Sequence, residues 1–324
     1  MSIKIVILGN GISAQLFMSY LKYHINANYS CLVLEKNVNI KGNGIDDVPF
    51  YFNSVIDDFS NLFVPITVEM GIYNKGNIIY QGNKNLTDKY AMKVLGIHSS
   101  NTIKFVEKKK RAYIIKNSDG NVGRKMIFYS ELQKLNSKHK YLFGTEVVGV
   151  DVSDQILHLS SGDKMNYDFL ISTISLKTLN SIARQWHFVD SILNLYPFFI
   201  NRVQVVADNK YRVLYCLDDE IRFSRIAKLN DTIFLETRSE VDLAHTTLEE
   251  QKFMNLLFDP AHILSKSHYV YPGRFKQINE DVFIRIKEKY RRANIFLLGR
   301  MATWRFKLVE DIYEDCKEIC ECIF

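Results

Sequence analysis

Residues 3–14, Ile-Lys-Ile-Val-Ile-Leu-Gly-Asn-Gly-Ile-Ser-Ala, decide how the fold of this chain is interpreted. The apolar run up to Leu8 predicts a buried strand, and the run after Ala14 predicts a helix. Between them stands Gly-x-Gly-x-x-Ala, which in this strand–turn–helix context is typical of a dinucleotide-binding turn. Gly9 permits the tight turn, Gly11 lets a pyrophosphate approach the backbone, and the small Ala14 lets helix and strand pack closely. The N-terminus of the helix then presents N–H groups and a positive dipole end to the phosphates.

A second strand that ends in an acidic residue completes this motif. Residues 31–34, Cys-Leu-Val-Leu, predict a buried strand, and Glu35 follows it. An acidic side chain at this place accepts hydrogen bonds from the adenosine ribose hydroxyls, and it lies about 20 residues after the glycine turn, as the motif requires. Its charge repels a 2′-phosphate, so the sequence argues against NADP. The alternative interpretation is an ordinary α/β turn with an acidic residue placed after it by chance.

The composition is that of an ordinary globular protein. The 324 residues are 47% hydrophobic and 24% charged, which suits two domains or one large one. No apolar run reaches the roughly 18 residues of a membrane span, and we recognise no signal peptide before the first strand. We therefore expect a cytoplasmic protein that does not act at a membrane. Nothing in the sequence indicates an oligomeric state.

The cysteines indicate reduced thiols rather than a disulfide framework or a metal site. They form an odd, irregular set: Cys31, Cys216, Cys316, Cys320 and Cys322. The last three lie together near the C-terminus, where metal ligation is one interpretation. No second Cys/His pair has the spacing of a zinc site, so we expect no metal.

Part of the net charge of +6 lies in a basic stretch, residues 104–116. It contains Lys-Lys-Lys-Arg at 108–111, and Tyr113 follows. Basic residues beside an aromatic side chain bind phosphate-bearing substrates or nucleic acid in some proteins. A solvated loop or strand edge is the alternative. A nucleic acid therefore stays among the candidate partners.

Hydrophobic periodicity predicts an α/β fold. We expect helices over 127–135, 248–258 and about 308–322. We expect strands over 146–152, 155–159, 167–174, 199–207, 213–216, 223–227, 232–236 and 294–298. The closely spaced strands between 198 and 238 indicate a mainly antiparallel sheet.

The strand expected over 294–298 runs into a second glycine turn, Gly299-Arg300, and a helix begins about eight residues later. A nucleotide with two ends can lie between two such turns. The first turn would take the adenosine pyrophosphate, and the second would lie near the ribityl chain and ring of a flavin. We therefore expect FAD as the cofactor.

The second turn resembles the C-terminal FAD signature of the flavin amine oxidase superfamily, whose relatives include UDP-galactopyranose mutase and protoporphyrinogen oxidase-like proteins. The matching residues are 299–306, Gly-Arg-Met-Ala-Thr-Trp-Arg-Phe, with 310–312 beyond. Further matching segments follow the family's order: 129–132, 144–150, 167–174, 221–226 and 269–272. The resemblance covers most of the chain and is weakest in the middle.

The resemblance implies a Rossmann-type FAD-binding domain, GR2-like, interleaved with a mainly antiparallel substrate domain. The FAD-binding domain would be discontinuous, comprising residues 1–40, 125–180 and 290–324. The substrate domain would comprise 41–124 and 181–289.

The resemblance also implies which residues hold the cofactor. The pyrophosphate would be held by Gly9, Gly11, Ser13 and Ala14. Glu35 would hold the ribose with Lys36 beside it, and the backbone of Val147 or Val148 would touch the adenine edge. Gly299 and Arg300 would line the pyrophosphate and ribityl region, and Val309 and Glu310 would place helix N-terminal amides near the flavin pyrimidine carbonyl. Such amides stabilise negative charge on a reduced flavin.

The chain departs from the family pattern in three ways. The family's Gly-Gly after the ribose glutamate is Gly-Asn-Gly here, at 42–44. The mutase branch has a histidine near the flavin in the next segment, whereas 48–53 read Val-Pro-Phe-Tyr-Phe-Asn. That difference counts against authentic mutase activity. The chain is also short for an amine oxidase, so a trimmed substrate domain is expected.

Four side chains are candidates for the substrate side of the site. Arg225 suits a small-molecule or nucleotide-bearing anionic substrate, the alternative being a surface ion pair with Asp218 or Glu236. Trp304 would wall the flavin cavity, the alternative being a core or hinge tryptophan. Tyr51 would take the place of the missing histidine, and Tyr271 stands at an expected strand end before a proline.

Several functions remain open at this point. The leading hypothesis is an FAD-dependent oxidoreductase that acts on a C–N or C–H bond, with hydride passing to flavin N5. The second is a flavin-dependent mutase or lyase without net redox change. The third is a flavoprotein that binds or acts on a nucleic acid, and the last is a nucleotide-binding protein without turnover. No Gly-x-Ser-x-Gly turn supports hydrolase chemistry.

Overall fold

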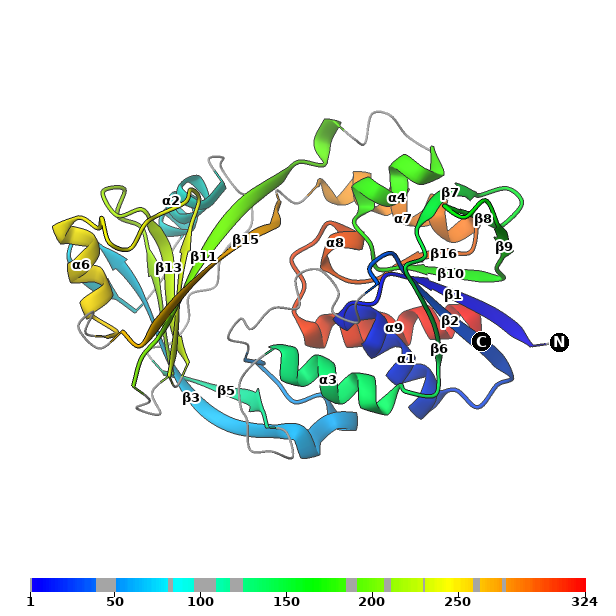
Figure 1. Ribbon diagram of the computed structural model, residues 1–324, viewed down its shortest axis with the longest axis horizontal. Helices are drawn as coiled ribbons and strands as arrows, with labels where there is room; N and C mark the ends of the chain where they lie inside the picture. The colour runs from blue at the N-terminus through cyan, green and yellow to red at the C-terminus, as the bar shows by residue number, and fades with distance from the viewer. Residues whose placement is uncertain are drawn as a thin grey trace.

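Two β-sheets dominate the computed structural model, one at each end of the elongated molecule in Figure 1. The structure describes residues 2–38, 51–80, 84–95, 109–116, 125–184, 191–206, 211–229, 231–258, 263–275 and 278–324. The departure at 42–44 and the first three residues of the departure at 48–53 therefore lie outside the described residues.

The first sheet is parallel and has the order β16-β10-β1-β2-β6. Its strands are β1 (Ile3–Leu8), β2 (Tyr29–Glu35), β6 (Lys140–Phe143), β10 (Phe169–Ser172) and β16 (Ile295–Leu297). The central strands are continuous apolar runs, as expected where both faces of a parallel sheet are covered. Because all five strands run the same way, the turns that follow β1 and β16 emerge at the same edge.

Helices cover both faces of this sheet. One face packs on α1 (Ile12–His24), α3 (Lys125–Leu135) and α9 (Val309–Ile323), which share one hydrophobic cluster. The other face packs on α4 (Leu176–Ala183), α7 (Glu280–Arg292) and α8 (Arg300–Thr303), together with a small sheet of β7 (Val147–Asp151), β8 (Ile156–Leu159) and β9 (Lys164–Asn166). The cysteines Cys316 and Cys320 are buried in α9, which explains their helical spacing by packing.

Helices α4 and α7 and strand β6 were not among the elements expected from the sequence. Both helices begin with a side-chain cap, in which Ser175 accepts from the N–H of Thr178 and Asn279 accepts from that of Asp281. Helix α7 also has an acidic first turn and a basic last turn, which suits the helix dipole. These local signals predict helix ends, but hydrophobic periodicity does not reveal α7, because its buried face is narrow, with three buried residues in thirteen.

The second sheet has the order β15-β11-β14-β13-β12-β3-β4, with β5 paired to β3. Its strands are β3 (Phe63–Asn74), β4 (Asn77–Ile79), β5 (Lys109–Ile115), β11 (Leu195–Gln204), β12 (Tyr211–Cys216), β13 (Phe223–Leu229), β14 (Thr232–Thr237) and β15 (Ser265–Phe275). Only the β12–β3 pair is parallel among the described pairs, so the expectation of a mainly antiparallel sheet is confirmed.

Different helices lie against the two faces of this sheet. Helix α6 (Leu248–Asn255) covers the face that carries the largest apolar cluster, and α2 (Lys84–Leu95) packs on the other. In Figure 1, β11 and β15 extend from this sheet toward α4 and α8, and β3 and β5 run below toward α3. A short 3₁₀ helix, η1 (Asp57–Leu62), leads into β3.

The strands of the parallel sheet all fall within the ranges expected for the FAD-binding domain. The core beneath it also receives Phe52, Ile56 and Phe59, which belong to the range expected for the substrate domain. The two sheets are thus connected by a segment whose side chains enter the core of the other part. The exact domain boundaries remain a prediction.

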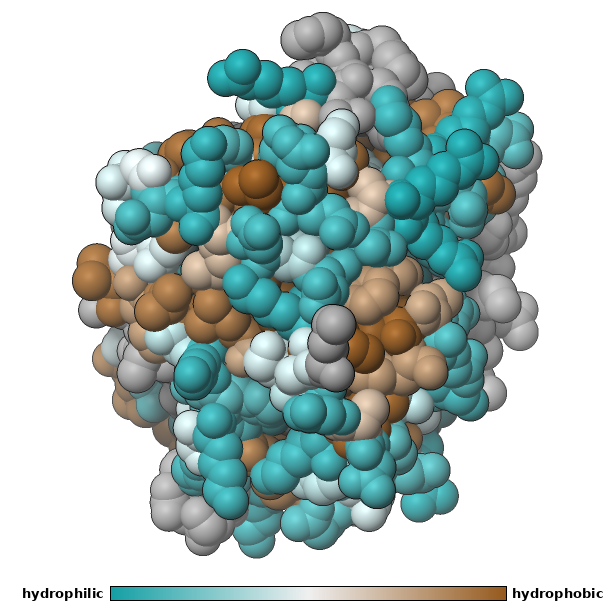
Figure 2. Space-filling view, turned by 90° about the vertical axis from the view of Figure 1, so that its right-hand side faces the viewer, coloured by the Kyte–Doolittle hydropathy of each residue, from teal (hydrophilic) through white to brown (hydrophobic). Residues whose placement is uncertain are grey.

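The surface of the molecule mixes polar and apolar residues. Figure 2 views the end formed by the parallel sheet, where hydrophilic residues are interspersed with smaller apolar patches. Within the described ranges, no helix is long and apolar enough to cross a bilayer.

His139, which follows α3, should make the stability of the fold depend on pH. Burial lowers the pKa of His139 from its ordinary value of 6.5, and the charge of Lys22 lowers it further, although a backbone hydrogen bond to Met18 acts the other way. His139 therefore binds a proton more readily in the unfolded chain than in the folded one. As a result, the free energy of unfolding falls as the pH drops through 6.5. Urea titrations at pH 7.5 and 5.5 should show a smaller loss in His139→Gln than in the native chain, and equal losses would contradict this.

Candidate functional site

The two glycine turns touch each other at the carboxyl edge of the parallel sheet. Gly9 has a φ of +90°, and a Cβ built on it would lie 2.8 Å from the hydroxyl oxygen of Thr173. Gly299 has a φ of +91°, and its Cβ would lie 2.2 Å from the hydroxyl oxygen of Ser13. Both positions therefore require glycine. The second turn rests against the first residues of α1, as a ligand spanning both turns would need.

Gly11, in contrast, faces open space. It is the N-cap of α1, and a Cβ built on it would have no atom within 4 Å. The first hydrogen bond of the helix runs from Gln15 N–H to Gly11 C=O at 3.1 Å, which leaves the earlier N–H groups without an acceptor inside the helix. An open backbone and outward N–H groups fit a pyrophosphate at this place.

Glu35 lies at the end of β2 and is 7% exposed. Its Oε2 accepts from the N–H of Asn10 at 2.9 Å. Its Oε1 accepts from the N–H of Asn37 at 2.9 Å and from Nδ2 of the same residue at 2.8 Å. A carboxylate has about four acceptor sites, so these three donors fix its orientation and leave capacity for a ribose hydroxyl.

A buried polar network behind this turn was missed in the sequence analysis. Asn10 is fully buried, its Nδ2 donates to the hydroxyl of Tyr129 at 2.8 Å, and its Oδ1 accepts from Nε2 of Gln15 at 2.7 Å. Burial, then Tyr141 and Glu35, raise the pKa of Tyr129, so its phenol is neutral. The variable position of Gly-x-Gly is thereby tied to α3 and α1, and a polar residue there followed by a polar helical residue was the available signal.

The residues expected at the adenine lie at the start of β7. Val147 is half-buried, whereas Val148 is 51% exposed. The ladder with β8 shifts register between Val147 and Gly149, so Val148 has no residue opposite it. Lys36 is exposed.

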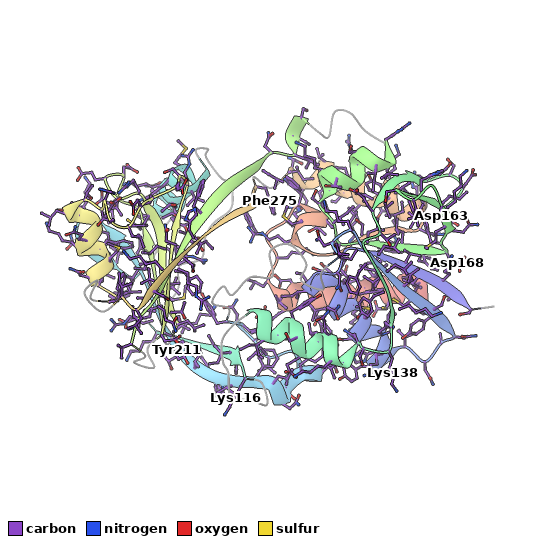
Figure 3. All side chains as sticks on the ribbon, viewed as in Figure 1. Lys116, Lys138, Asp163, Asp168, Tyr211 and Phe275 are labelled. Atoms are coloured by element: carbon purple, nitrogen blue, oxygen red, sulfur yellow. The ribbon has the colours of Figure 1, made fainter. Side chains whose placement is uncertain are left out.

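The segment from the second turn to α9 places its aromatic side chains differently from expectation. Trp304 has no exposed surface and packs on Phe275 with 5.0 Å between ring centroids, so the structure places it in the core, the alternative given for it. Phe306, 44% exposed, was missed in the sequence analysis. The guanidinium of Arg300 lies 5.2 Å from the ring of Phe275 and 4.9 Å from that of Phe306. Figure 3 shows Phe275 at the end of β15, between the two sheets.

Helix α9 begins beside this segment. Asp311 caps it, accepting from Leu308 N–H at 2.7 Å, and the first helical hydrogen bond runs from Ile312 N–H to Leu308 C=O at 3.1 Å. The amides of Val309 and Glu310 therefore lie in the first turn, where helix N–H groups have no intrahelical acceptor. This geometry suits the expected contact with an electron-rich carbonyl.

The side chain of Glu310 has a further contact that the sequence did not indicate. Its Oε1 accepts from the N–H of Asn53 at 2.6 Å and from that of Ser54 at 3.1 Å. These residues are 256 or more positions away in the chain. Glu310 thus joins α9 to the segment that contains Tyr51.

Two of the four substrate-side candidates, Tyr51 and Arg225, lie together on the face of the antiparallel sheet opposite α6. Tyr51 packs on an apolar cluster of β3, β5, β12 and β13, next to Tyr215, which pairs in register with Arg225. Burial raises the pKa of Tyr51, Tyr215 adds to this, and Arg225 opposes it, so the phenol of Tyr51 is neutral.

Arg225 also forms the ion pair with Glu236 that was the alternative for it. Its side chain is 32% exposed, and its Nε has no hydrogen-bond partner in the described part of the chain. Burial lowers the pKa of the guanidinium, but Glu236 and neighbouring tyrosines outweigh this and raise it overall. Arg225 therefore stays charged, and its Nε is a buried donor without an acceptor in the described part of the chain. Arg222 lies on the other side of the sheet, where it binds Glu250 of α6.

The remaining candidates are less informative. Tyr271 lies in β15 opposite Phe198, and its side chain is outside the described part of the structure. Of the basic stretch, 104–108 also lie outside the described residues. In β5, Lys110 donates to the side chain of Asn53, and Arg111 lies 5.6 Å from the ring of Tyr113.

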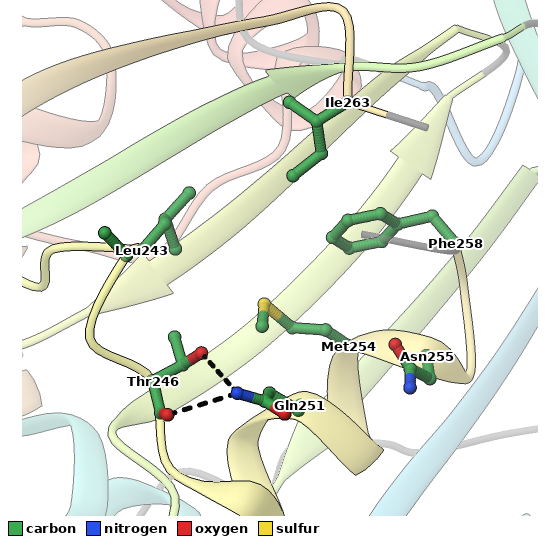
Figure 4. Close-up of a pocket in the computed structure, with 8 residues that line it drawn as sticks. Leu243, Thr246, Gln251, Met254, Asn255, Phe258 and Ile263 are labelled. Atoms are coloured by element: carbon green, nitrogen blue, oxygen red, sulfur yellow. Dashed lines mark hydrogen bonds between the residues drawn. The ribbon is translucent and has the colours of Figure 1, made fainter. Parts of the chain in front are cut away.

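A separate hollow of about 310 Å³ lies beside α6 (Figure 4). Its lining is uncharged, comprising Leu243, Ala244, Thr246, Gln251, Met254, Asn255, Phe258 and Ile263. Gln251 Nε2 donates to the backbone oxygen of Thr246 at 3.3 Å. Because this hollow is on the α6 side of the antiparallel sheet, away from Tyr51 and Arg225, it is not the candidate site.

Solved structures with the same architecture include two that match the whole of this chain. A reduced UDP-galactopyranose mutase matches with a TM-score of 0.73 at 13% identity, over 100% of this chain and 94% of that one. A protein from Exiguobacterium sp. 255-15, provisionally named protoporphyrinogen oxidase, matches with 0.66 at 10% identity, over 100% and 99%. The chain shares the fold of these two solved structures. The resemblance and the α/β fold class expected from the sequence are thus confirmed at the level of the fold.

Other similar structures carry different activities on this fold. A fatty acid isomerase from P. acnes that produces CLA matches with a TM-score of 0.59 at 11% identity, over 99% of this chain and 98% of that one. No family model matches the chain, and no curated protein matches its sequence. Because one fold hosts several reactions, the reaction has to be argued from the site.

Proposed function

We propose that this protein is an FAD-dependent enzyme. The observation that carries the proposal is the contact between the two glycine turns, where Gly299 abuts Ser13 while Gly11 beside them faces open space. Glu35, at the neighbouring strand end, has a fixed carboxylate with acceptor capacity left for a ribose. Residues that fit a pyrophosphate and a ribose at one sheet edge suit a dinucleotide, and the second turn favours FAD over NAD.

The cofactor would extend along the sheet edge between the two groups of elements. Gly9, Gly11, Ser13 and Ala14 would hold the pyrophosphate, Glu35 with Lys36 the ribose, Val147 or Val148 the adenine, Gly299 and Arg300 the ribityl region, and Val309 and Glu310 the pyrimidine end of the ring. The exposed Phe306 replaces Trp304 as the aromatic side chain proposed to border the flavin. Residues 41–124 and 181–289 would form the substrate domain.

We propose an oxidoreductase that acts on a C–N or C–H bond of an anionic small molecule. FAD, when bound, supplies hydride acceptance at N5. The chain supplies an anion site in Arg225, whose Nε has no partner among the described residues, and a neutral phenol in Tyr51 that can donate a hydrogen bond. Helix α9 would place its positive end near the pyrimidine end of the ring, where it would stabilise negative charge.

A second candidate is a redox-neutral flavoenzyme, a mutase, lyase or isomerase. It is favoured by the names of two proteins of the same fold, a mutase and a fatty acid isomerase. Consumption of oxygen or another acceptor during turnover would exclude it. Nucleic-acid binding by β5 is a weaker candidate, and a mobility shift that salt does not weaken would exclude phosphate contacts.

The test of the proposal is the visible spectrum of the purified protein, followed by acid release and chromatography of any yellow cofactor. Bound FAD at close to one per chain is the expected result. A colourless protein that takes up no flavin on incubation would overturn it.

Replacing Glu35 by alanine should weaken FAD binding about 10- to 100-fold, the effect of removing one charge-assisted hydrogen bond. Removing the carboxylate also leaves the N–H of Asn10 without this acceptor, so the backbone of the first glycine turn is held less firmly. Flavin content after dialysis against graded concentrations of free FAD measures it. Asp154→Ala, which removes an exposed carboxylate in the turn between β7 and β8, is the control, and an equal loss in both variants would contradict the role of Glu35.

A further inference from the structure

The segment Tyr51–Ser54 passes between the two halves of the molecule. Tyr51 packs on the face of the antiparallel sheet, whereas the next residue, Phe52, is buried in the core shared by α1, α3 and α9. Consecutive side chains in an extended segment point opposite ways, so this strand-like stretch places one residue in each core. Its position therefore sets how Tyr51 stands relative to the parallel sheet.

Hydrogen bonds from β5 and from α9 hold this segment. The backbone of Phe52 exchanges hydrogen bonds with that of Tyr113 in β5, at 2.8 and 2.9 Å. Lys110, also in β5, donates to the side-chain oxygen of Asn53. Both of these contacts belong to the antiparallel sheet. From α9, the carboxylate of Glu310 receives the N–H groups of Asn53 and Ser54.

Two adjacent acidic residues at the start of α9, Glu310 and Asp311, accept hydrogen bonds from different segments. Asp311 accepts from the N–H of Leu308, the residue that precedes its own helix. The carboxylate of the neighbouring Glu310 accepts from another segment instead. A carboxylate that receives two backbone N–H groups makes stronger hydrogen bonds than a neutral acceptor does.

We propose that Glu310 is a positioning residue that fixes Tyr51 on the substrate side relative to the cofactor end of α9. This inference rests on the proposed function for its meaning, since the backbone of Glu310 lies in the helix turn assigned to the flavin pyrimidine. Glu310 then contributes to both the cofactor side and the substrate side of the site. Its amide belongs to the cofactor pocket, and its side chain sets the segment that carries Tyr51.

The experiment uses the FAD-loaded full chain and three variants. Glu310→Ala removes the acceptor, Glu310→Gln keeps an acceptor oxygen without the charge, and Glu314→Ala removes an exposed carboxylate one turn further along α9. Flavin content is measured first. Hydrogen–deuterium exchange with mass spectrometry then follows the peptide that contains Asn53 and Ser54.

We expect these two amides to exchange about 10- to 100-fold faster in Glu310→Ala than in the native chain, the effect of losing a charge-assisted acceptor. Glu310→Gln should restore most of the protection, and Glu314→Ala should match the native chain. Unchanged exchange in Glu310→Ala would overturn the inference, as would a loss of protection in Glu314→Ala of equal size. Failure of the native chain to bind flavin is a different result, because it would overturn the proposed function while the exchange data still test the contact.

Discussion

Replacing Gly11 by valine should abolish stoichiometric FAD binding and leave the fold intact. The backbone of Gly11 is extended, with φ −83° and ψ −177°, which valine adopts freely, and no atom lies within 4 Å of the added Cβ. The new side chain would therefore occupy only the space in which we place the pyrophosphate. We expect the affinity for FAD to fall by more than about 100-fold, equivalent to roughly 2.8 kcal/mol.

The cost to the fold itself should be small. Loss of a glycine N-cap costs about 1 kcal/mol, which in a chain of this size shifts the melting temperature by about 2–4 °C. Flavin content and the thermal unfolding of the apoprotein measure the two effects separately. Flavin retained at the native level in Gly11→Val would show that the pyrophosphate lies elsewhere.

Gly299→Ala is the contrasting variant. Its Cβ would lie 2.2 Å from Ser13 Oγ, and its φ of +91° is strained for alanine. It should lose both flavin and thermal stability. The pair separates a glycine required by the ligand from a glycine required by the fold.

The sequence predicted the elements that are apolar and continuous. Strands β1, β2 and β10 and helix α1 follow from apolar runs such as 3–8. The two turns follow from Gly9 and Gly299, whose φ values are +90° and +91°. Helix α7 was missed because its evidence lies in the polar cap at Asn279 rather than in a wide apolar stripe, and α4 was missed because it is only eight residues long. Edge strand β6 was missed because it is short and half-exposed.

Site residues could be predicted from the sequence only where a local motif contains them. Gly11 and Glu35 are predicted by the spacing of the dinucleotide-binding motif. The partners of Glu310, in contrast, are separated from it by more than 250 residues. No local pattern contains such a contact. Trp304 and Phe306 show the same limit in another form, because two aromatic residues two positions apart differ in burial only through what the tertiary fold places beside them.

Replacing Arg222 by alanine should lower the free energy of unfolding by about 3 kcal/mol, the lower end of the cost of leaving a buried charge without its partner. Arg222 donates through Nε and Nη2 to the two carboxylate oxygens of Glu250, each at 2.7 Å, and the carboxylate has no exposed surface. Removing the guanidinium leaves a buried charge with only backbone donors, from Thr247 and from residue 222 itself.

The same pair gives the sign of a pH effect that the variant should lose. Burial acts to raise the pKa of Glu250, but Arg222 and the backbone N–H groups outweigh it, so the pKa lies below its ordinary value of 4.5. The stabilisation is therefore complete above pH 4.5 and is lost as the pH falls through the folded value. The difference in unfolding free energy between the native chain and Arg222→Ala should accordingly shrink in acid.

Arg212→Ala is the matched control for this prediction, because Arg212 binds Glu69 on the same sheet but that glutamate is 30% exposed. Water can solvate Glu69 once its partner is gone, so the expected loss is about 1 kcal/mol or less. Urea unfolding of both variants at neutral pH decides the matter. Equal losses would contradict the prediction, because they would show that the burial of Glu250 does not increase the cost of removing its arginine partner.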